Sequence, residues 1–551
     1  MKRLFQNRST RYRRIILIFT LAITLALPSV EAAPGGLDAS FNSPNGFATL
    51  PDSFFTDVAI QPDSKVLAVG QKEDKSEPGD TSRSLIVARF NTDGTLDASF
   101  STNGVATPVS SDEVVGAAIA VQPDGKIVAA GFTHPLPGGF FVTRFLANGE
   151  PDAGFGQMGS VTINFGGALE GANSIAIGSD GTIVVAGSSV FGAVDSNPMT
   201  FIAIARLLGD GNLDPAFGSG GKILAQRGNA TDVAVLGDGR ILASGLVPDT
   251  LPTDFALLRF NSDGTPDVTF AGGDGIATAD FRNQDISLDM AVQPDGRVVL
   301  AGSALNPGEP SSDALARFDS NGNLDPSFDG DGKVIAPPSA DTLNATGVAI
   351  QSDGGIVTVG SVNIGSMSEV FCVVSRYTSN GSPDLSFGSG GRVVTDFPGK
   401  WATSGGGAIQ SDGKILLVGA QTDQGQLFGL VARFLGNGAP PPPPPPVFDI
   451  CLQTNNGNSG KLVFKFNSAT GAYEFRDCAK GFVLTGTGTI TVNFCKLDLT
   501  DVGPVKPSDR TVTVQVNTCT KKATVSVTIK SPSKMYGFTD NDITQGSCTC
   551  P

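Results

Sequence analysis

The chain repeats one pattern, in which two apolar runs are joined by a short polar turn. In residues 118–131, AIAVQPDGKIVAAG, the turn is Pro-Asp-Gly. Proline presets φ for the first turn position, aspartate tolerates the bend, and glycine adopts the left-handed conformation that closes a hairpin. The apolar runs show little alternation with polar residues, which is typical of strands buried on both faces. Each copy therefore predicts a buried β-hairpin.

Seven copies of this hairpin occur between residues 37 and 438, each accompanied by two shorter motifs. One motif resembles Leu-Asp-x-Ser-Phe, and the other is Ala-Arg-Phe or a variant of it. The motif phenylalanines, 53 to 62 residues apart, are Phe41, Phe100, Phe155, Phe217, Phe270, Phe328 and Phe387. The motif aspartates are Asp38, Asp97, Asp152, Asp214, Asp267, Asp325 and Asp384. The motif arginines are Arg89, Arg144, Arg206, Arg259, Arg317, Arg376 and Arg433.

A repeat of this length with several short strands is typical of a β-propeller blade. In the second repeat we expect strands near 105–108, 118–122, 126–131 and 140–145. One blade cannot bury both of its apolar faces, whereas a blade packed between two neighbours can. The sequence predicts an all-β fold with a seven-bladed β-propeller at 37–438, four strands in each blade, and the motif phenylalanines packed between blades.

The sequences LDASF, VQPDGKIVAAG and ARFNTDGTLD resemble the delta-60 repeat of secreted bacterial β-propeller proteins. The resemblance covers residues 37–438 and implies a propeller fold and export, but no activity. The third and fourth repeats depart from it, because Gly178-Ser-Asp-Gly and Leu236-Gly-Asp-Gly stand where the other repeats have Gln-Pro-Asp-Gly or a close variant.

Residues 1–32 have the features of a secretory signal peptide. Basic residues precede an apolar run at 15–27, and Val30-Glu-Ala is a suitable cleavage site. The run is too short for an ordinary membrane span. We therefore expect a secreted, periplasmic or cell-surface protein with no transmembrane segment after cleavage.

The expected cleavage makes the chain more acidic. The signal holds six of the 38 basic residues and one of the 53 acidic residues, so the remaining chain has a net charge of about −20. Such a surface repels phosphate backbones, which argues against nucleic acid as a partner.

A proline-rich linker at 439–446 separates the propeller from a predicted cysteine-rich β module at 447–551, which we expect to be sandwich-like. The small size, export and even cysteine number favour up to three disulfides over a zinc site, with the pairing open. The candidate cysteines are Cys451, Cys478, Cys495, Cys519, Cys548 and Cys550. We expect Cys372, in an apolar stretch of the propeller, to be a buried free thiol.

The sequence offers little for catalysis except carboxylates. His134 is the only histidine and is expected in a loop, and the chain has no nucleophile elbow, zinc-protease, P-loop or dinucleotide motif. Calcium is an alternative for the Asp-Gly turns at Asn91–Asp97 and Asp329–Gly332, although neither completes a calcium loop and both suit tight turns. No other cofactor is expected.

A variable position on the first hairpin strand is a candidate ligand site. It holds Asp57, Asp232 and Asp289, but Ala, Ser or Gly in the other repeats. If this strand is innermost in its blade, the three aspartates surround one mouth of the central channel. They would bind a cation or a hydroxyl-rich ligand there, unless they are simply solvated strand ends.

The motif arginines and aspartates predict how the ring closes. Six arginines precede the next motif aspartate by eight residues, which leaves Asp38 and Arg433 unpaired at the two ends. In a closed ring these two residues should pair, and residues 47–50 should complete the last blade beside 430–434. The alternative is that each aspartate only caps its own turn.

These features support three hypotheses on function. The first is an exported, monomeric binding or scaffold protein that recognises an extracellular protein or glycan. The second is a carbohydrate-active hydrolase or lyase that uses the channel-mouth carboxylates. In the third, the C-terminal module serves attachment or sorting and the propeller is its cargo.

Overall fold

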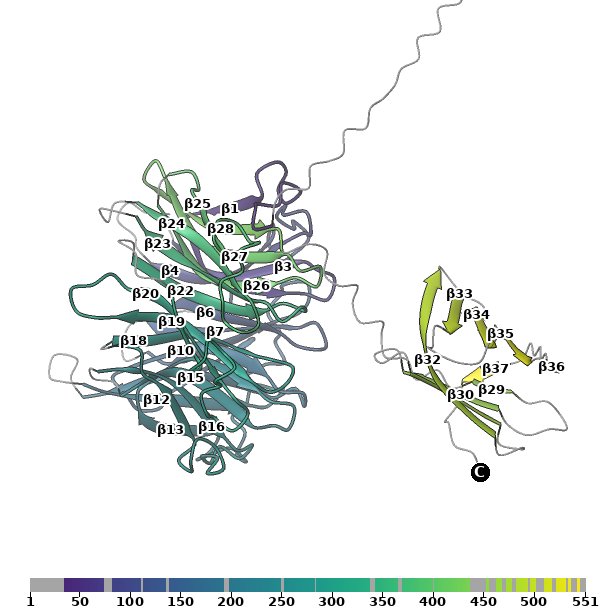
Figure 1. The fold of residues 1–551 in the computed structure, drawn as a ribbon. Helices are drawn as coiled ribbons and strands as arrows, with labels where there is room; N and C mark the ends of the chain where they lie inside the picture. Colours follow the sequence, from purple (N-terminus) through teal and green to yellow (C-terminus); the bar gives the residue numbers. More distant parts are fainter. Residues whose placement is uncertain are drawn as a thin grey trace, which may run out of the picture.

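The computed structural model describes residues 34–436, apart from gaps at 74–81, 111, 135–137, 193–197, 249–251, 283, 337–341, 365–368 and 400, and the backbone of nine strands after residue 451. The regular elements of these residues are all strands (Figure 1). No helix in this part of the chain is long and apolar enough to cross a membrane. The predicted signal peptide and proline-rich linker lie outside the described residues and stay predictions.

Residues 34–436 form seven four-stranded antiparallel units, one for each repeat, and the last two units are joined into one eight-stranded sheet. The inner strands are β2 (Ser53–Ile60), β6 (Glu113–Val121), β10 (Leu169–Ile177), β14 (Asn229–Val235), β18 (Gln284–Val292), β22 (Thr342–Ile350) and β26 (Trp401–Ile409). The second strands are β3 (Val66–Glu73), β7 (Ile127–His134), β11 (Ile183–Phe191), β15 (Ile241–Val247), β19 (Val298–Leu305), β23 (Ile356–Asn363) and β27 (Ile415–Asp423). The third strands are β4 (Arg83–Phe90), β8 (Phe140–Phe145), β12 (Met199–Leu207), β16 (Asp254–Phe260), β20 (Ser312–Phe318), β24 (Val370–Tyr377) and β28 (Gln426–Phe434). The outer strands are β5 (Val105–Ala106), β9 (Ser160–Ile163), β13 (Lys222–Arg227), β17 (Ile276–Ala279), β21 (Lys333–Ile335), β25 (Arg392–Thr395) and β1 (Phe47–Pro51).

The inner strands contact one another in chain order, and β2 also contacts β26, so the units form a closed ring. Closure is completed by the N-terminal strand β1, which is the outer strand of the last unit. It pairs antiparallel with β28, with Ala48 opposite Val431 and Leu50 opposite Gly429 (Figure 1). This is the pairing that the sequence predicts for residues 47–50.

The core of the ring lies between neighbouring units. The second and third strands have runs of consecutive buried residues, for example Val66–Gly70 in β3 and Leu85–Phe90 in β4. Both faces of these strands are therefore covered, as expected for apolar runs without alternation. The seven motif phenylalanines are at most 1% exposed, and Cys372 is a buried free thiol. Burial raises the pKa of that thiol to about 12.

The C-terminal region is described only as backbone strands in one antiparallel order, β36-β35-β34-β33-β32-β31-β30-β29-β37. They are β29 (Leu452–Thr454), β30 (Leu462–Asn467), β31 (Ala472–Asp477), β32 (Phe482–Asn493), β33 (Lys496–Asp501), β34 (Arg510–Asn517), β35 (Lys522–Ser531), β36 (Lys534–Tyr536) and β37 (Ile543–Gln545). The six candidate disulfide cysteines lie outside the described residues. A β-rich module is therefore seen, whereas its disulfides stay a prediction.

Candidate functional site

The predicted ligand position lies in the middle of the inner strands, not at the mouth of the channel. Asp57, Asp232 and Asp289 are interior residues of β2, β14 and β18. In every unit a β-bulge directly precedes this position, for example between Phe55 and Asp57. The sequence predicts that the strand of the second repeat begins at this position, at residue 118, whereas the observed strand β6 begins five residues earlier, at Glu113.

Each of the three channel aspartates bonds to the backbone of the next unit. Asp57 Oδ2 accepts a hydrogen bond of 2.9 Å from Ile119 N, and Asp289 Oδ2 accepts one of 2.6 Å from Val348 N. Asp232 Oδ2 accepts one of 3.2 Å from Met290 N. These bonds tie consecutive inner strands together around the channel, which favours a structural role for the three carboxyl groups.

The channel environment raises the pKa of all three groups. Burial is the main cause for Asp57, whose pKa rises from 3.8 to about 7. For Asp289, burial and the nearby charge of Asp232 act together and raise the pKa well above its usual range. Burial also raises the pKa of Asp232, and its carboxyl group is hydrogen-bonded to that of Asp289. Both members of the Asp232–Asp289 pair therefore take up a proton more readily than an ordinary aspartate.

These shifts predict that stability falls as pH rises. The folded chain holds these protons more tightly than the unfolded chain, so the stabilisation is complete below about pH 4 and is lost as pH rises through the folded-state pKa of each group, which is about 7 for Asp57. We expect the melting temperature of the wild type to fall relative to that of Asp289→Asn as pH rises above about 4, because burial and the charge of Asp232 raise the pKa of Asp289 in the folded chain. The asparagine amide supplies a hydrogen-bond donor to Asp232 at every pH.

The matched control is Asp124→Asn, which makes the same change in net charge at an exposed turn. Its melting temperature should follow that of the wild type across the pH range. If the curves of Asp289→Asn and the wild type stayed parallel, the channel pair would not be the source of the pH dependence.

The motif arginines and aspartates form a repeated clamp between units. In six units the arginine Nε lies 2.7–2.9 Å from Oδ2 of the motif aspartate, and Arg376 contacts Asp384 through Nη1. In the same six units Nη1 donates to a backbone carbonyl in the turn of the next unit. The guanidinium carbon also lies 4.3–4.8 Å from the centre of a motif phenylalanine ring. The sequence predicts the ion pairs but not this cation–π stacking.

The turns considered for calcium use their oxygens internally. Asp93 Oδ1 accepts hydrogen bonds from the Thr95 backbone and hydroxyl, at 3.0 and 2.7 Å. Asp97 contacts both Arg89 and Lys65, each at 2.9 Å. Asp331 Oδ1 accepts a bond of 2.9 Å from Lys333 N. These contacts are those of ordinary turns and clamps.

His134 is not in a loop, as expected from its neighbouring prolines, but is the last residue of β7 and pairs with Glu113. Its ring packs against Phe132, with 5.7 Å between centroids. The pairing of β7 with β6 continues past Gly131, which ends the apolar run, and therefore includes His134 in the strand.

A cavity lies at the turn face where the repeat pattern is broken, between the third and fourth units. In the second and sixth units, Gln122 and Gln351 donate to the carbonyls of Gly181 and Gly413 in the following turns, at 3.5 and 2.9 Å. Gly178 takes the place of this glutamine in the third unit, and a cavity of about 280 Å³ occupies the junction. We call it the unit 3–4 cleft; it is lined by Gly178, Ser179, Asp180, Thr182, Val184, Arg206, Val235, Gly237, Asp238, Gly239, Ile241 and Ser262.

The unit 3–4 cleft exposes one of the clamps. The Arg206 side chain is 13% exposed, whereas the side chains of the other six motif arginines are at most 9% exposed. A larger hollow of about 610 Å³ lies at the same kind of junction between the fifth and sixth units. The turn face is therefore hollowed at these two junctions between units.

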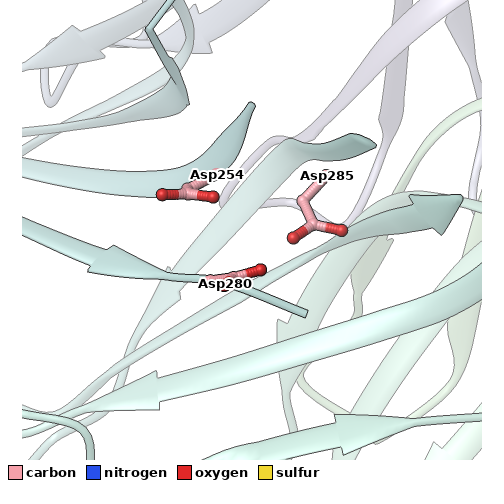
Figure 2. A group of neighbouring side chains, drawn as sticks. All are labelled: Asp254, Asp280 and Asp285. Carbon is pink, nitrogen blue, oxygen red and sulfur yellow. The ribbon is translucent and has the colours of Figure 1, made fainter. Parts of the chain in front are cut away.

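Sequence reasoning missed a second polar cluster. Asp254, Asp280 and Asp285 come together where the fourth and fifth units meet (Figure 2). Asp254 lies in β16, Asp280 follows β17 and Asp285 lies in β18. Only an alignment of the repeats in register would have predicted that these residues meet at one junction between units.

Comparison with known proteins supports the repeat fold. The model of a β-propeller domain of unknown function, DUF5122, matches one segment in each repeat, at 61–100, 122–155, 178–217, 236–270, 293–328, 351–387 and 410–440. These matches show that this part of the chain is a repeat β-propeller. A search of curated proteins found no match.

Solved structures that match part of the chain include a hydrolase, a peptidase and a polysaccharide lyase. A puromycin hydrolase is 12% identical with a TM-score of 0.41, and the match covers 77% of this chain and 58% of that one. An acylaminoacyl peptidase from Pyrococcus horikoshii is 10% identical with a TM-score of 0.36, covering 77% and 57%. The chain thus spans under two thirds of the length of both. A PL25 ulvan lyase is 10% identical with a TM-score of 0.27, covering 69% and 78%. Likenesses this low transfer no activity.

Proposed function

We propose that the chain is an exported binding protein whose seven-bladed propeller of delta-60-type repeats recognises an extracellular glycan at the unit 3–4 cleft. The observation that carries the proposal is the coincidence of this cavity with the break in the repeat pattern at Gly178. A rigid scaffold commonly carries its recognition site where its loops vary.

The lining of the cleft suits a hydroxyl-rich ligand. Asp180 and Asp238 offer carboxylate acceptors, and hydrogen bonds from Thr182 and Arg240 respectively hold the pKa of each below its usual range. The Arg206 guanidinium, which also contacts Asp214 and the Ser262 carbonyl, lines the same cavity. A volume of about 280 Å³ is near the lower end for small-molecule sites and matches one or two sugar rings better than a protein segment.

The enzyme hypothesis has less support than binding. Glycoside hydrolases hold two carboxyl groups about 5–10 Å apart around the scissile bond. Asp232 and Asp289 are instead hydrogen-bonded to each other, and each also accepts backbone N–H groups. These bonds occupy the oxygens that an acid–base pair would need.

The remaining parts of the proposal rest on the sequence alone. Residues 1–32 direct export, which places the monomeric protein outside the cytoplasm, in the periplasm or at the cell surface. The prolines of 439–446 hold the propeller away from a disulfide-stapled module at 447–551, which attaches or sorts it.

Restoring the repeat pattern should close the cleft. In the double variant Gly178→Gln, Thr182→Lys, the glutamine should reach the Gly239 carbonyl, as Gln351 reaches Gly413. The lysine should reach Asp214, as Lys126 reaches Asp152 at 3.3 Å. Changing Thr182 also removes a hydroxyl that would crowd the new side chain. A glycan array probed with the full chain lacking its signal should show a ligand that the double variant binds at least tenfold more weakly, with an unchanged or higher melting temperature.

The matched control is Gln122→Gly, which opens the equivalent junction between the second and third units and should leave glycan binding intact. Binding that survives in the double variant would place the site elsewhere. An array without any bound glycan would contradict the proposed ligand class.

A further inference from the structure

Three carboxyl groups converge at the junction of the fourth and fifth units, at the strand ends opposite the Asp-Gly turns (Figure 2). Asp254 is the first residue of β16, Asp280 directly follows β17, and Asp285 is the second residue of β18. One oxygen from each lies within 4.8 Å of the other two. Asp285 is buried, Asp254 is half-buried and Asp280 is exposed, so the group is open to solvent on one side.

The buried member of the group has an oxygen without a donor. Asp285 is 0% exposed, and its Oδ2 accepts bonds of 2.6 and 3.0 Å from Phe281 N and Arg282 N. Its Oδ1 has no hydrogen-bond partner among the described residues. In Figure 2 the carboxyl group of Asp285 extends toward Asp280. Burying half of a carboxylate without a partner is unfavourable unless a positive ligand is bound.

The second and third units provide an internal comparison. Glu170 occupies the position of Asp285 there, and its carboxylate accepts bonds from Phe165 N, Gly167 N and the Ser189 hydroxyl. Ser189 lies opposite Glu170 in the sheet, whereas Ala304 lies opposite Asp285. The junction of the fourth and fifth units therefore lacks the hydrogen-bond donor that Ser189 provides at the other junction.

The same comparison shows a gain of negative charge. At the junction of the second and third units, Gly139 and Asn164 occupy the positions of Asp254 and Asp280. The carboxylate of Glu170 thus needs only its protein donors, whereas Asp285 faces two further carboxyl groups.

The nearby cations are engaged elsewhere. Arg282 lies 3.6 Å from Glu309, and Lys333 Nζ donates to the backbone carbonyl of Asp280 and lies over the Phe281 ring. Neither forms an ion pair with the three carboxyl groups in the described part of the chain. Burial first, and then the charge of Asp280, raise the pKa of both Asp254 and Asp285. The cluster therefore carries repulsion that a cation would relieve.

We propose that Asp254, Asp280 and Asp285 bind a calcium ion that links the fourth and fifth units. Calcium takes oxygen ligands at about 2.3–2.6 Å, so two ligands on opposite sides of the ion lie up to about 5 Å apart. Magnesium, at about 2.0–2.1 Å, needs a tighter octahedral set. Water would complete the coordination on the open side, next to Asp280.

The test uses the full chain without its signal, freed of divalent ions by a chelator and dialysed. Adding millimolar calcium chloride should raise the melting temperature by several degrees, and calorimetric titration should show binding. Asp280→Asn should weaken that binding at least tenfold and remove most of the shift. Without calcium, Asp280→Asn should melt at or above the wild type, because it relieves repulsion.

Glu170→Gln is the matched control at the other junction. It should lower the melting temperature equally with and without calcium and leave the calcium-induced shift unchanged. The proposal fails if calcium does not shift the wild type, or if Asp280→Asn and Asp254→Asn bind as the wild type does. A response to magnesium equal to that to calcium would contradict the choice of ion.

Discussion

Replacing Arg433 by alanine should destabilise the propeller by about 3–5 kcal/mol, because it leaves a buried carboxylate without its partner. Arg433 and Asp38 are 5% and 6% exposed, and Nε lies 2.8 Å from Oδ2. The same guanidinium donates to the Thr92 carbonyl at 2.6 Å and to the Ser40 hydroxyl at 3.0 Å. One side chain thus holds the last unit against the first.

A double-mutant cycle measures the pairing itself. Asp38→Ala and Arg433→Ala should show a coupling of at least about 1 kcal/mol, although 395 positions separate them in the chain. Burial would raise the pKa of Asp38, but hydrogen bonds from Ser40 and the charges of Arg433 and Lys414 outweigh it and lower that pKa. Asp38 is therefore ionised in the folded state, as a coupled ion pair requires.

Arg144 and Asp152 form the matched control, with the same Nε–Oδ2 contact at 2.8 Å inside one stretch of chain. Their coupling should be similar, since the contacts are alike. Breaking the pair of Asp38 and Arg433, but not the control pair, should also make the two ends of the propeller chain sensitive to proteolysis. A coupling of zero at Asp38 and Arg433, with the control pair coupled, would show that β1 alone closes the ring.

Much of the propeller could be predicted from the sequence because its determinants are local and repeated. Each Asp-Gly turn and apolar run specifies a hairpin by itself, and seven copies specify a ring. The pairing of Asp38 with Arg433 followed from one unmatched residue at each end of a regular spacing. Such reasoning needs only the period of the repeat.

The finer features depend on register and on neighbours that a single repeat does not show. The inner strands begin several residues before the channel aspartates, which therefore lie within the strands and not at their ends. The cluster of Asp254, Asp280 and Asp285 joins residues from two units. The missing hydrogen-bond donor is seen only when Ala304 is compared with Ser189, its counterpart in another unit. The cavity at Gly178 likewise lies between two units, where glycine stands in place of the glutamine that reaches the next unit from Gln351.

Removing a motif phenylalanine should cost about as much as breaking the closing ion pair. Phe328 and Phe387 are both fully buried, and truncation of such a side chain to alanine costs about 3–5 kcal/mol through lost burial and the cavity left behind. The Phe328 ring also packs under Gly381, whose φ of +93° and lack of a Cβ permit this close approach.

The two phenylalanines differ in the cation above the ring, and this difference should be measurable. The Arg317 guanidinium lies 4.6 Å from the centre of the Phe328 ring. Arg376, its counterpart near Phe387, instead donates to Gln351 at 2.6 Å and contacts Asp353. Leucine keeps most of the buried apolar volume but has no π face. We therefore expect Phe328→Leu to destabilise the propeller by about 0.5–2 kcal/mol more than Phe387→Leu, the range for a partly desolvated cation–π contact. Thermal and chemical unfolding of the two leucine variants would measure the difference, and equal losses would mean that the stacking contributes nothing beyond apolar packing.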